Sequence, residues 1–304
     1  MLTRRNLFKT AGLATAVALL PTVSFPISAK KESAFRFSLN TSTIRGQKPG
    51  LLKYIDIASK AGYDGIELWV EDVKQYLESG NSVQSLKKYL SDSGLKVENA
   101  IGFAPWLLGK QGFDQMKTEM EMMASIGCTR IAAPAAGVPY DQPFDLLEAG
   151  HKYKALIELG RQTGVMPILE FWGGSKGLYH LGQAMMVAAV ANDPDAKILA
   201  DVFHLFLGNS GFDSIKMLSG NVIEVFHMND YVATIPREQQ KDSDRVYPGD
   251  GVAPMKQILT DLKNMGGPKV LSLELFNETY WKRDPLLVAQ TGLKKMKELV
   301  SEVG

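Results

Sequence analysis

The chain has 304 residues, of which 45% are hydrophobic and 22% charged, so it can bury a large core and is neither disordered nor fibrous. Its 34 Lys and Arg residues and 33 Asp and Glu residues leave a formal net charge of +1. No basic cluster occurs along the body of the chain, which argues against nucleic acid as the main partner because phosphate binding needs clustered cations. A single cysteine, Cys128, excludes an intramolecular disulfide.

The first 29 residues are typical of an export signal. Arg4, Arg5 and Lys9 form a basic start, residues 11–20 are apolar, and residues 27–29 are an imperfect small-x-small cleavage pattern. The paired arginines resemble those of twin-arginine signals. An uncleaved membrane anchor is the alternative, but the apolar run is too short for a comfortable span. We therefore expect a signal peptide at 1–29, a periplasmic protein with no stable membrane anchor, and one catalytic domain at 30–304.

Short apolar runs alternate with longer helical patterns from residue 34 onward. The expected strands are 35–42, 65–70, 96–103, 129–136, 165–172, 196–205, 222–230 and 269–276. Helical periodicity is clear between them, for example at 51–62, 144–164 and 284–300. Eight strands in strict alternation with eight helical segments predict an α/β fold, a (β/α)8 TIM barrel. A doubly wound sheet is the alternative, but the chain has no glycine-rich phosphate loop. The long polar connection 231–251 is expected to be functional or mobile.

Polar residues interrupt the last four apolar strands near their ends. They are Glu170, Asp201, His227 and Glu274. In a barrel the carboxyl ends of the strands face a common mouth, and unpaired buried carboxylates there cost several kcal/mol. One divalent metal ion would compensate them, and this oxygen-rich set favours Mn²⁺, with Mg²⁺, Co²⁺, Fe²⁺ or Zn²⁺ as alternatives. The other interpretation is that Glu170 and Glu274 pair with arginines while His227 is a packed core residue.

The chain also resembles the xylose isomerase-like TIM barrels, in particular the branch with sugar phosphate isomerases/epimerases, hydroxypyruvate isomerase, ketose 3-epimerases and inosose-processing enzymes. The resemblance covers 34–300 and rests on the segments "LEF", "DVFH", "FHMND", "YPGDG" and "LELFNETYW" followed by "DPL". It implies that Glu170, Asp201, His227 and Glu274 bind one divalent metal. It also implies that His204 hydrogen-bonds a substrate hydroxyl or carbonyl.

These residues predict a carbohydrate isomerase or epimerase that works through an enediolate. A metal that chelates a carbonyl and a neighbouring hydroxyl makes the carbon between them acidic. Glu170 and Glu274 can then act as an acid/base pair, one removing the proton and the other returning it. Return to the opposite face epimerises the carbon, return to the neighbouring carbon isomerises the sugar, and loss of a β-hydroxyl dehydrates it.

Further residues near the strand ends are candidates for substrate binding. They are Glu67, Trp106, Trp172, Arg237 and Arg245. Aromatic residues at strand ends are buried in the hydrophobic core at least as often as they contact a ligand, so this remains the alternative for the two tryptophans. Asp230 is expected to orient the His227 imidazole as an acceptor or to serve the substrate.

The sequence differs from parts of this family at three points, and these differences limit which of the family's activities the resemblance implies. Trp172 stands where the hydride-shift xylose isomerases have a lysine, which disfavours a hydride shift. Ala233 stands where ketose 3-epimerases have an arginine. The substrate contact at that point must therefore come from another residue, such as Arg237 or Arg245. Four histidines are too few for the three-zinc endonucleases of this fold.

Three functions remain open from the sequence. The leading one is the isomerase or epimerase with a small sugar substrate. The second is a metal-dependent lyase or hydratase acting on oxidised (keto) sugars or glycosides. The third is a non-catalytic sugar-binding barrel, which would have no need for two opposed carboxylates. The sequence leaves homo-oligomerisation open.

Overall fold

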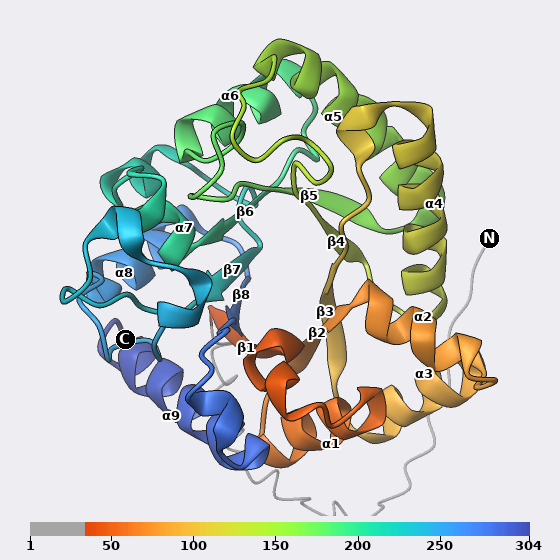
Figure 1. Cartoon of the computed structure of the whole chain (residues 1–304), viewed down its shortest axis with the longest axis vertical. Helices are drawn as coiled ribbons and strands as arrows, with labels where there is room; N and C mark the ends of the chain where they lie inside the picture. Colours follow the sequence, from red (N-terminus) through yellow and green to blue (C-terminus); the bar gives the residue numbers. More distant parts are fainter. Residues whose placement is uncertain (1–33) are drawn as a thin grey trace, which may run out of the picture. The chain divides into compact units, whose positions relative to one another are not determined.

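The computed structural model describes residues 34–304 and shows a closed barrel of eight parallel strands in the order β1 to β8 (Figure 1). The expected (β/α)8 fold is thus confirmed, whereas the expected export signal at 1–29 lies outside the described residues and stays a prediction. The strands are β1 Phe35–Asn40, β2 Gly65–Trp69, β3 Lys96–Ile101, β4 Arg130–Ala133, β5 Met166–Glu170, β6 Ile198–Asp201, β7 Val225–Met228 and β8 Lys269–Leu273.

Helices surround the barrel as an outer ring (Figure 1). They are α1 Leu51–Ala61, α2 Val70–Glu78, α3 Val83–Asp92, α4 Lys110–Ser125, α5 Leu146–Thr163, α6 Leu181–Ala191, α7 Val202–Leu207, α8 Met255–Met265 and α9 Pro285–Ser301. The alternation is less strict than expected, because α2 and α3 both follow β2 and α7 has only six residues. Among residues 34–304, no helix is both long enough and apolar enough to cross a membrane.

Local sequence signals fix the helix ends where the periodicity placed them. The side chain of Asp145 accepts hydrogen bonds from the first amides of α5, and Gly164 ends that helix in the left-handed conformation. Asp284 caps α9 in the same way, and Pro285 occupies its first turn, where no donor is lost. The expected helices 144–164 and 284–300 therefore agree with the structure to within two residues.

Several strands end earlier than their apolar runs predicted. The expected strand 196–205 stops at Asp201, whose Oδ1 accepts a hydrogen bond from the His204 amide at 2.9 Å and starts α7. Likewise 222–230 shortens to Val225–Met228. The apolar residues after Asp201 pack as helix instead of strand, because the aspartate is a strong N-cap. This early stop leaves Asp201 at the carboxyl edge of the barrel.

The barrel interior has an apolar part and a polar part. Six small or branched side chains fill the apolar part: Ile101, Ala132, Ile168, Leu199, Val225 and Val270. Strand register then aligns Asp201 with His227 and His227 with Ser272, so these side chains point into the barrel together. The barrel interior is thus filled with side chains, and the polar layer with Asp201 and His227 lies at the carboxyl ends of the strands.

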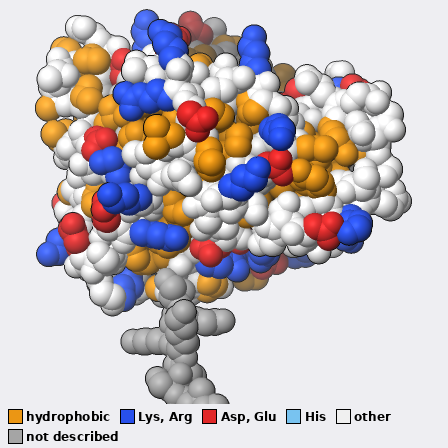
Figure 2. All heavy atoms as spheres, turned by 90° about the horizontal axis from the view of Figure 1, so that it is seen from below, with side chains coloured by type: hydrophobic (Ala, Val, Ile, Leu, Met, Phe, Trp, Pro, Cys, Tyr) orange, Lys and Arg blue, Asp and Glu red, His pale blue; other side chains and the backbone are white. Residues whose placement is uncertain are grey.

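The connection after β7 is ordered by short turns. It contains the 3-10 turns Arg237–Gln239 and Asp242–Asp244, and an antiparallel bridge joins Asp230 to Val246. On the face drawn in Figure 2, Lys and Arg side chains are interspersed with Asp and Glu. That face therefore offers no single-sign patch of the kind that phosphate backbones require.

Candidate active site

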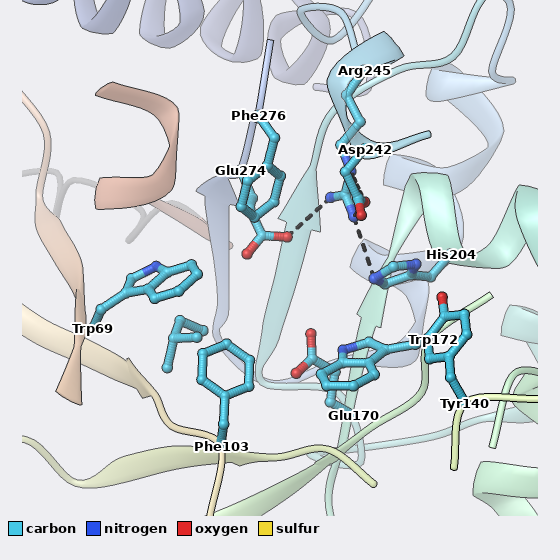
Figure 3. A pocket seen from close by; sticks show the side chains of 11 residues that line it. Trp69, Phe103, Tyr140, Glu170, Trp172, His204, Asp242, Arg245, Glu274 and Phe276 are labelled. Carbon is cyan, nitrogen blue, oxygen red and sulfur yellow. Dashed lines mark hydrogen bonds and ion pairs between the residues drawn. The ribbon is translucent and has the colours of Figure 1, made fainter. Parts of the chain in front are cut away.

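A cavity of about 250 Å³ opens where the carboxyl ends of the strands meet (Figure 3). Its lining combines five aromatic residues with five polar or charged ones, and includes Trp69, Ile101, Phe103, Tyr140, Glu170, Trp172, His204, Asp242, Arg245, Glu274 and Phe276. Five residues predicted from the sequence lie here, namely Glu170, Trp172, His204, Arg245 and Glu274. The barrel mouth is where TIM-barrel enzymes place their active sites.

Asp201, His227 and Glu274 offer three ligand atoms that lie within 4.8 Å of one another, and all three residues are buried. His227 Nδ1 lies 3.0 Å from Glu274 Oε2 and 3.7 Å from Asp201 Oδ2. This nitrogen is buried, and it faces both carboxylates. A buried nitrogen that faces two carboxylates fits a divalent cation with mixed nitrogen and oxygen ligands. Glu170 faces the same cavity from the end of β5 but is not part of this group.

The other nitrogen of the His227 ring is held by Glu67, the third residue of β2. His227 Nε2 lies 3.1 Å from Glu67 Oε1, and Glu67 also accepts hydrogen bonds from Asn99, Asn40 and Ser272. Burial opposes the charge on Glu67, but His227 and these donors together keep its pKa below the usual range. This is the arrangement that fixes the orientation of a metal-ligating imidazole. Glu67 therefore lies beneath His227 and does not line the cavity.

The same carboxylates act on the charge of His227. Burial favours the neutral ring, but Glu274 and Glu67 outweigh it and raise the pKa of His227 well above its ordinary value. A proton on Nδ1 and a cation beside it compete for one lone pair, so metal binding displaces the proton.

Among the carboxylates that line the cavity, Glu170 has the fewest hydrogen-bond and ion-pair partners. No hydrogen bond or ion pair to its carboxylate is found in the part of the chain that the structure describes. Burial raises its pKa to about 8, with His227 opposing the shift and the neighbouring carboxylates of Glu274 and Asp201 adding to it. Such a group can hold or release a proton near neutral pH.

Arg245 compensates the acidic end of the cavity. The guanidinium is 1% exposed, and its Nη1 lies 2.7 Å from Asp201 Oδ2 and 3.0 Å from Glu274 Oε2. Its Nη2 donates to Asp242 Oδ1 at 2.6 Å. The interpretation that the glutamates pair with arginines thus holds for Glu274 and not for Glu170.

His204 lies beside this guanidinium, on α7. The Gly173 amide donates to His204 Nδ1 at 3.3 Å. Burial lowers the pKa of His204 despite the nearby Asp201. Arg245 Nη2, a group that can only donate, lies 3.3 Å from His204 Nε2. Both ring nitrogens therefore face donors of the protein, and His204 belongs to the hydrogen-bond network of Arg245 on the cavity wall.

Besides Glu67, two other residues expected to bind substrate lie outside the cavity. Trp106 is fully buried, donates from Nε1 to the Pro134 carbonyl at 2.7 Å and packs against Tyr153, so it is a core residue. Arg237 is partly exposed, bonds to Asn209 and Glu238, and does not line the cavity. These two expectations are wrong because proximity to a strand end in sequence does not decide on which side of the barrel wall a side chain lies.

Asp230 also has a different role from the expected one. Its carboxylate accepts hydrogen bonds from the amides of Tyr231, Gly249, Gly251 and Ala253, at 2.8–3.1 Å. It therefore folds the connection after β7 and does not orient the imidazole, which Glu67 does instead. Gly251 is required here, because a Cβ would lie 2.2 Å from the Tyr231 carbonyl oxygen.

Several residues of the site were missed from the sequence. They are Asn40, which is buried and bridges Glu67 and Glu274, and Tyr140, Asp242 and Phe276 on the cavity wall. Asp242 had a signal, because it lies in the long polar connection and three residues before Arg245. Asn40 also had one, as a polar residue at the end of an apolar strand, whereas Tyr140 lies in the loop after β4, where no pattern indicated a site.

Comparison with known proteins gives consistent matches. The family model described as xylose isomerase-like TIM barrel matches residues 55–299. A protein named inosose isomerase from Halalkalibacterium halodurans is 26% identical over 273 residues, which cover 84% of this chain and 92% of that protein. The 3-dehydroshikimate dehydratase of Pseudomonas putida is 22% identical, over 85% of this chain and 41% of the relative. A crystal structure of IOLI protein with a binding zinc atom superposes with a TM-score of 0.81 and 23% identity, over 88% of this chain and 99% of that one.

Proposed function

The chain belongs to the xylose isomerase-like TIM barrel family, and we propose that it is a metal-dependent isomerase or epimerase of a ketone-bearing carbohydrate. The observation that carries the proposal is the cluster of Asp201, His227 and Glu274, whose ligand atoms lie within 4.8 Å of one another, together with Glu170 on the same cavity that Glu274 lines. The similarity to inosose isomerase over 84% of the chain supports this class of reaction.

Asp201, His227 and Glu274 would hold the ion, with Glu170 as a further carboxylate at the cavity. When bound, a divalent ion supplies positive charge that makes the hydrogen next to a substrate carbonyl acidic. The three carboxylates and one imidazole favour Mn²⁺ among the candidates, because hard oxygen ligands suit it. The zinc described for the IOLI structure makes Zn²⁺ the comparison to test.

The side chains around the cavity can move the proton and hold the substrate. Glu170 and Glu274 reach the cavity from β5 and from just after β8, so they can face a bound sugar from different strands. We assign them the roles of acid and base at the carbon next to the carbonyl. His204 hydrogen-bonds a substrate hydroxyl, while Trp172 covers an apolar face of the sugar. Arg245 balances the charge of the carboxylates.

The proposal is tested by product analysis with the metal-loaded protein. Protein stripped of metal is reconstituted with Mn²⁺ or Zn²⁺ and incubated with ketoses and inososes, and the products are identified by NMR. We expect an isomer or epimer to form with metal and not with chelator, and Glu274→Gln to abolish its formation while the protein still folds. The exposed variant Glu278→Gln is the matched control. A full rate in Glu274→Gln would remove Glu274 from the mechanism.

Dehydration is the second candidate, favoured by the similarity to 3-dehydroshikimate dehydratase. It begins with the same proton removal next to a carbonyl and ends with loss of a β-hydroxyl. An unsaturated product that absorbs in the ultraviolet would identify it in the same assay. Sugar binding without any product would instead favour a non-catalytic barrel.

A further inference from the structure

One wall of the catalytic cavity is built from aromatic rings, which we call the aromatic wall: Phe276, Trp69, Phe103, Trp172 and Tyr140 (Figure 3). Neighbouring rings in this order have centroids 6.4, 5.2, 6.2 and 6.5 Å apart, so the wall is continuous. Phe103 and Tyr140 are 44% and 53% exposed. Exposed rings in a polar cavity provide flat faces for the C–H side of a ring-shaped ligand.

A second cavity of about 320 Å³ adjoins the first. The two share Trp69, Ile101 and Phe103, so the middle of the aromatic wall separates them. The rest of the second cavity comes from the segments after β1, β2 and β3 and from α4: Arg45, Val70, Glu71, Gly102, Gln115 and Glu119. The two cavities thus lie on either side of Trp69 and Phe103, and a ligand long enough to cross over these two rings would occupy both.

Polar atoms of the second cavity residues lack partners. Gln115 donates to Glu119 Oε1 at 2.8 Å, but Glu119 Oε2 is buried with no partner. Arg45 donates from Nη2 to Asp72 at 2.9 Å and lies 3.8 Å over the Trp69 ring, while its Nη1 is buried with no partner. Unsatisfied buried polar atoms are rare and need an explanation. One free donor and one free acceptor match hydroxyl groups, which both give and accept hydrogen bonds.

The charges of the two cavities disfavour an anionic ligand. In the catalytic cavity Arg245 is already engaged by Asp201, Asp242 and Glu274. In the second cavity Arg45 is paired with Asp72, and the remaining charged residues are acidic. On both linings carboxylates outnumber arginines, so a phosphate ester would meet net negative charge, whereas a neutral hydroxylated ring meets no such repulsion.

Size points to the same ligand. A volume of about 250 Å³ is below the roughly 300–1,000 Å³ typical of pockets for larger ligands, and it leaves room for a single sugar ring. We propose that the second cavity binds a second sugar ring, so that the substrate is a neutral disaccharide or glycoside whose reacting ring bears the ketone. This inference rests on the proposed function and names the substrate class of that same site.

Matched sugar pairs test the inference. Dissociation constants are measured by calorimetry with the Mn²⁺-loaded protein for fructose and 4-O-glucosylfructose, and for 3-ketoglucose and 3-ketotrehalose. We expect the two-ring member of at least one pair to bind about tenfold more tightly, as one aromatic contact and one hydrogen bond would provide. Phe103→Ala and Glu119→Ala should each bring the ratio of the two constants close to one.

Leu108→Ala is the control, because Leu108 lies in the same connection after β3 as Phe103, is 59% exposed and lines neither cavity. It should keep the wild-type ratio. Equal affinity for one and two rings, or a ratio unchanged in Phe103→Ala and Glu119→Ala, would overturn the second subsite while leaving the proposed function in place. Binding of none of the four sugars would overturn the carbohydrate assignment itself, and the subsite with it.

Discussion

At the scale of single residues, the imidazole of His227 depends on a neighbour from the opposite side of the barrel. Glu67 holds Nε2, and three donors in turn hold Glu67. An anionic acceptor behind a ligating histidine fixes the ring and makes its other nitrogen a better ligand. The metal affinity of this site should therefore depend on a residue that would not touch the metal.

Replacing Glu67 by glutamine tests this dependence. The variant keeps the shape of the side chain but removes its charge, so we expect the dissociation constant for Mn²⁺ to rise about 10- to 100-fold. Titration against a fluorescent chelator measures the constant. Glu278→Gln, an exposed position, should leave it unchanged. Wild-type affinity in Glu67→Gln would mean that Asp201 and Glu274 bind the ion without help from the imidazole.

Trp106 and Trp172 follow strand ends alike but should respond differently to substitution. Trp106→Phe leaves the Pro134 carbonyl without its donor in the core and should lower the free energy of unfolding by about 1–3 kcal/mol. Trp172→Ala changes a cavity wall and should weaken sugar binding with a smaller loss of stability. Urea unfolding and calorimetry measure the two effects. The reverse pattern would contradict the assignment of Trp106 to the core.

At the scale of elements, the connection after β7 carries Arg245 and Asp242 to the cavity, and Asp230 ties this connection together. Asp230→Ala removes the acceptor of four amides, so we expect a loss of about 3 kcal/mol in unfolding free energy. Faster hydrogen exchange at Gly249, Gly251 and Ala253 would localise the effect. Asp250→Ala in the same connection removes only an ion pair to Lys295 and should cost under about 1 kcal/mol. Equal losses in both variants would show that Asp230 has no special role.

The amino ends of the strands, opposite the cavity, are joined by ion pairs. Glu224 lies 2.7 Å from Arg130 and 3.4 Å from Lys197. Burial opposes its charge, but Arg130 and Lys197 outweigh this effect and lower the pKa of Glu224 below the ordinary 4.5. Since the folded-state pKa is lowered, ionised Glu224 stabilises the fold above about pH 4.5, and this contribution disappears as pH falls through the folded-state pKa.

Glu224→Gln should therefore cost stability only where Glu224 is ionised. We expect the variant to be about 1 kcal/mol less stable than wild type at pH 7 and the gap to shrink towards pH 3. Urea unfolding at both pH values measures it. A gap of the same size at pH 3 would assign the loss to packing and not to charge.

At the scale of the whole molecule, the sequence was enough to predict the barrel, and the structure brings three of the four predicted metal ligands together. Alternating periodicities determine a (β/α)8 order, and barrel geometry then brings the ends of β5, β6, β7 and β8 to one mouth. Asp201, His227 and Glu274 were found in this way, because charged residues in apolar strands are conspicuous.

The partners of these residues were not predictable in the same way. Glu67 and Asp230 both lie near strand ends, but only Glu67 points inward, and that depends on register within each strand. The predicted strand lengths were wrong for a related reason, since the Asp201 cap turned residues 202–205 from strand into helix. Trp106 shows that a hydrophobic residue beside a strand end has no pattern that separates cavity from core.

The central claim is that this barrel uses a bound metal and opposed carboxylates to exchange the proton next to a carbohydrate ketone. The most direct measurement is deuterium incorporation from D₂O, followed by NMR, over a panel of free ketoses, inososes and 3-keto sugars with the Mn²⁺-loaded protein. We predict exchange at the carbon beside the carbonyl of at least one sugar, lost on chelation and in Glu274→Gln. The absence of exchange across the panel, with the metal shown to be bound, would contradict the account.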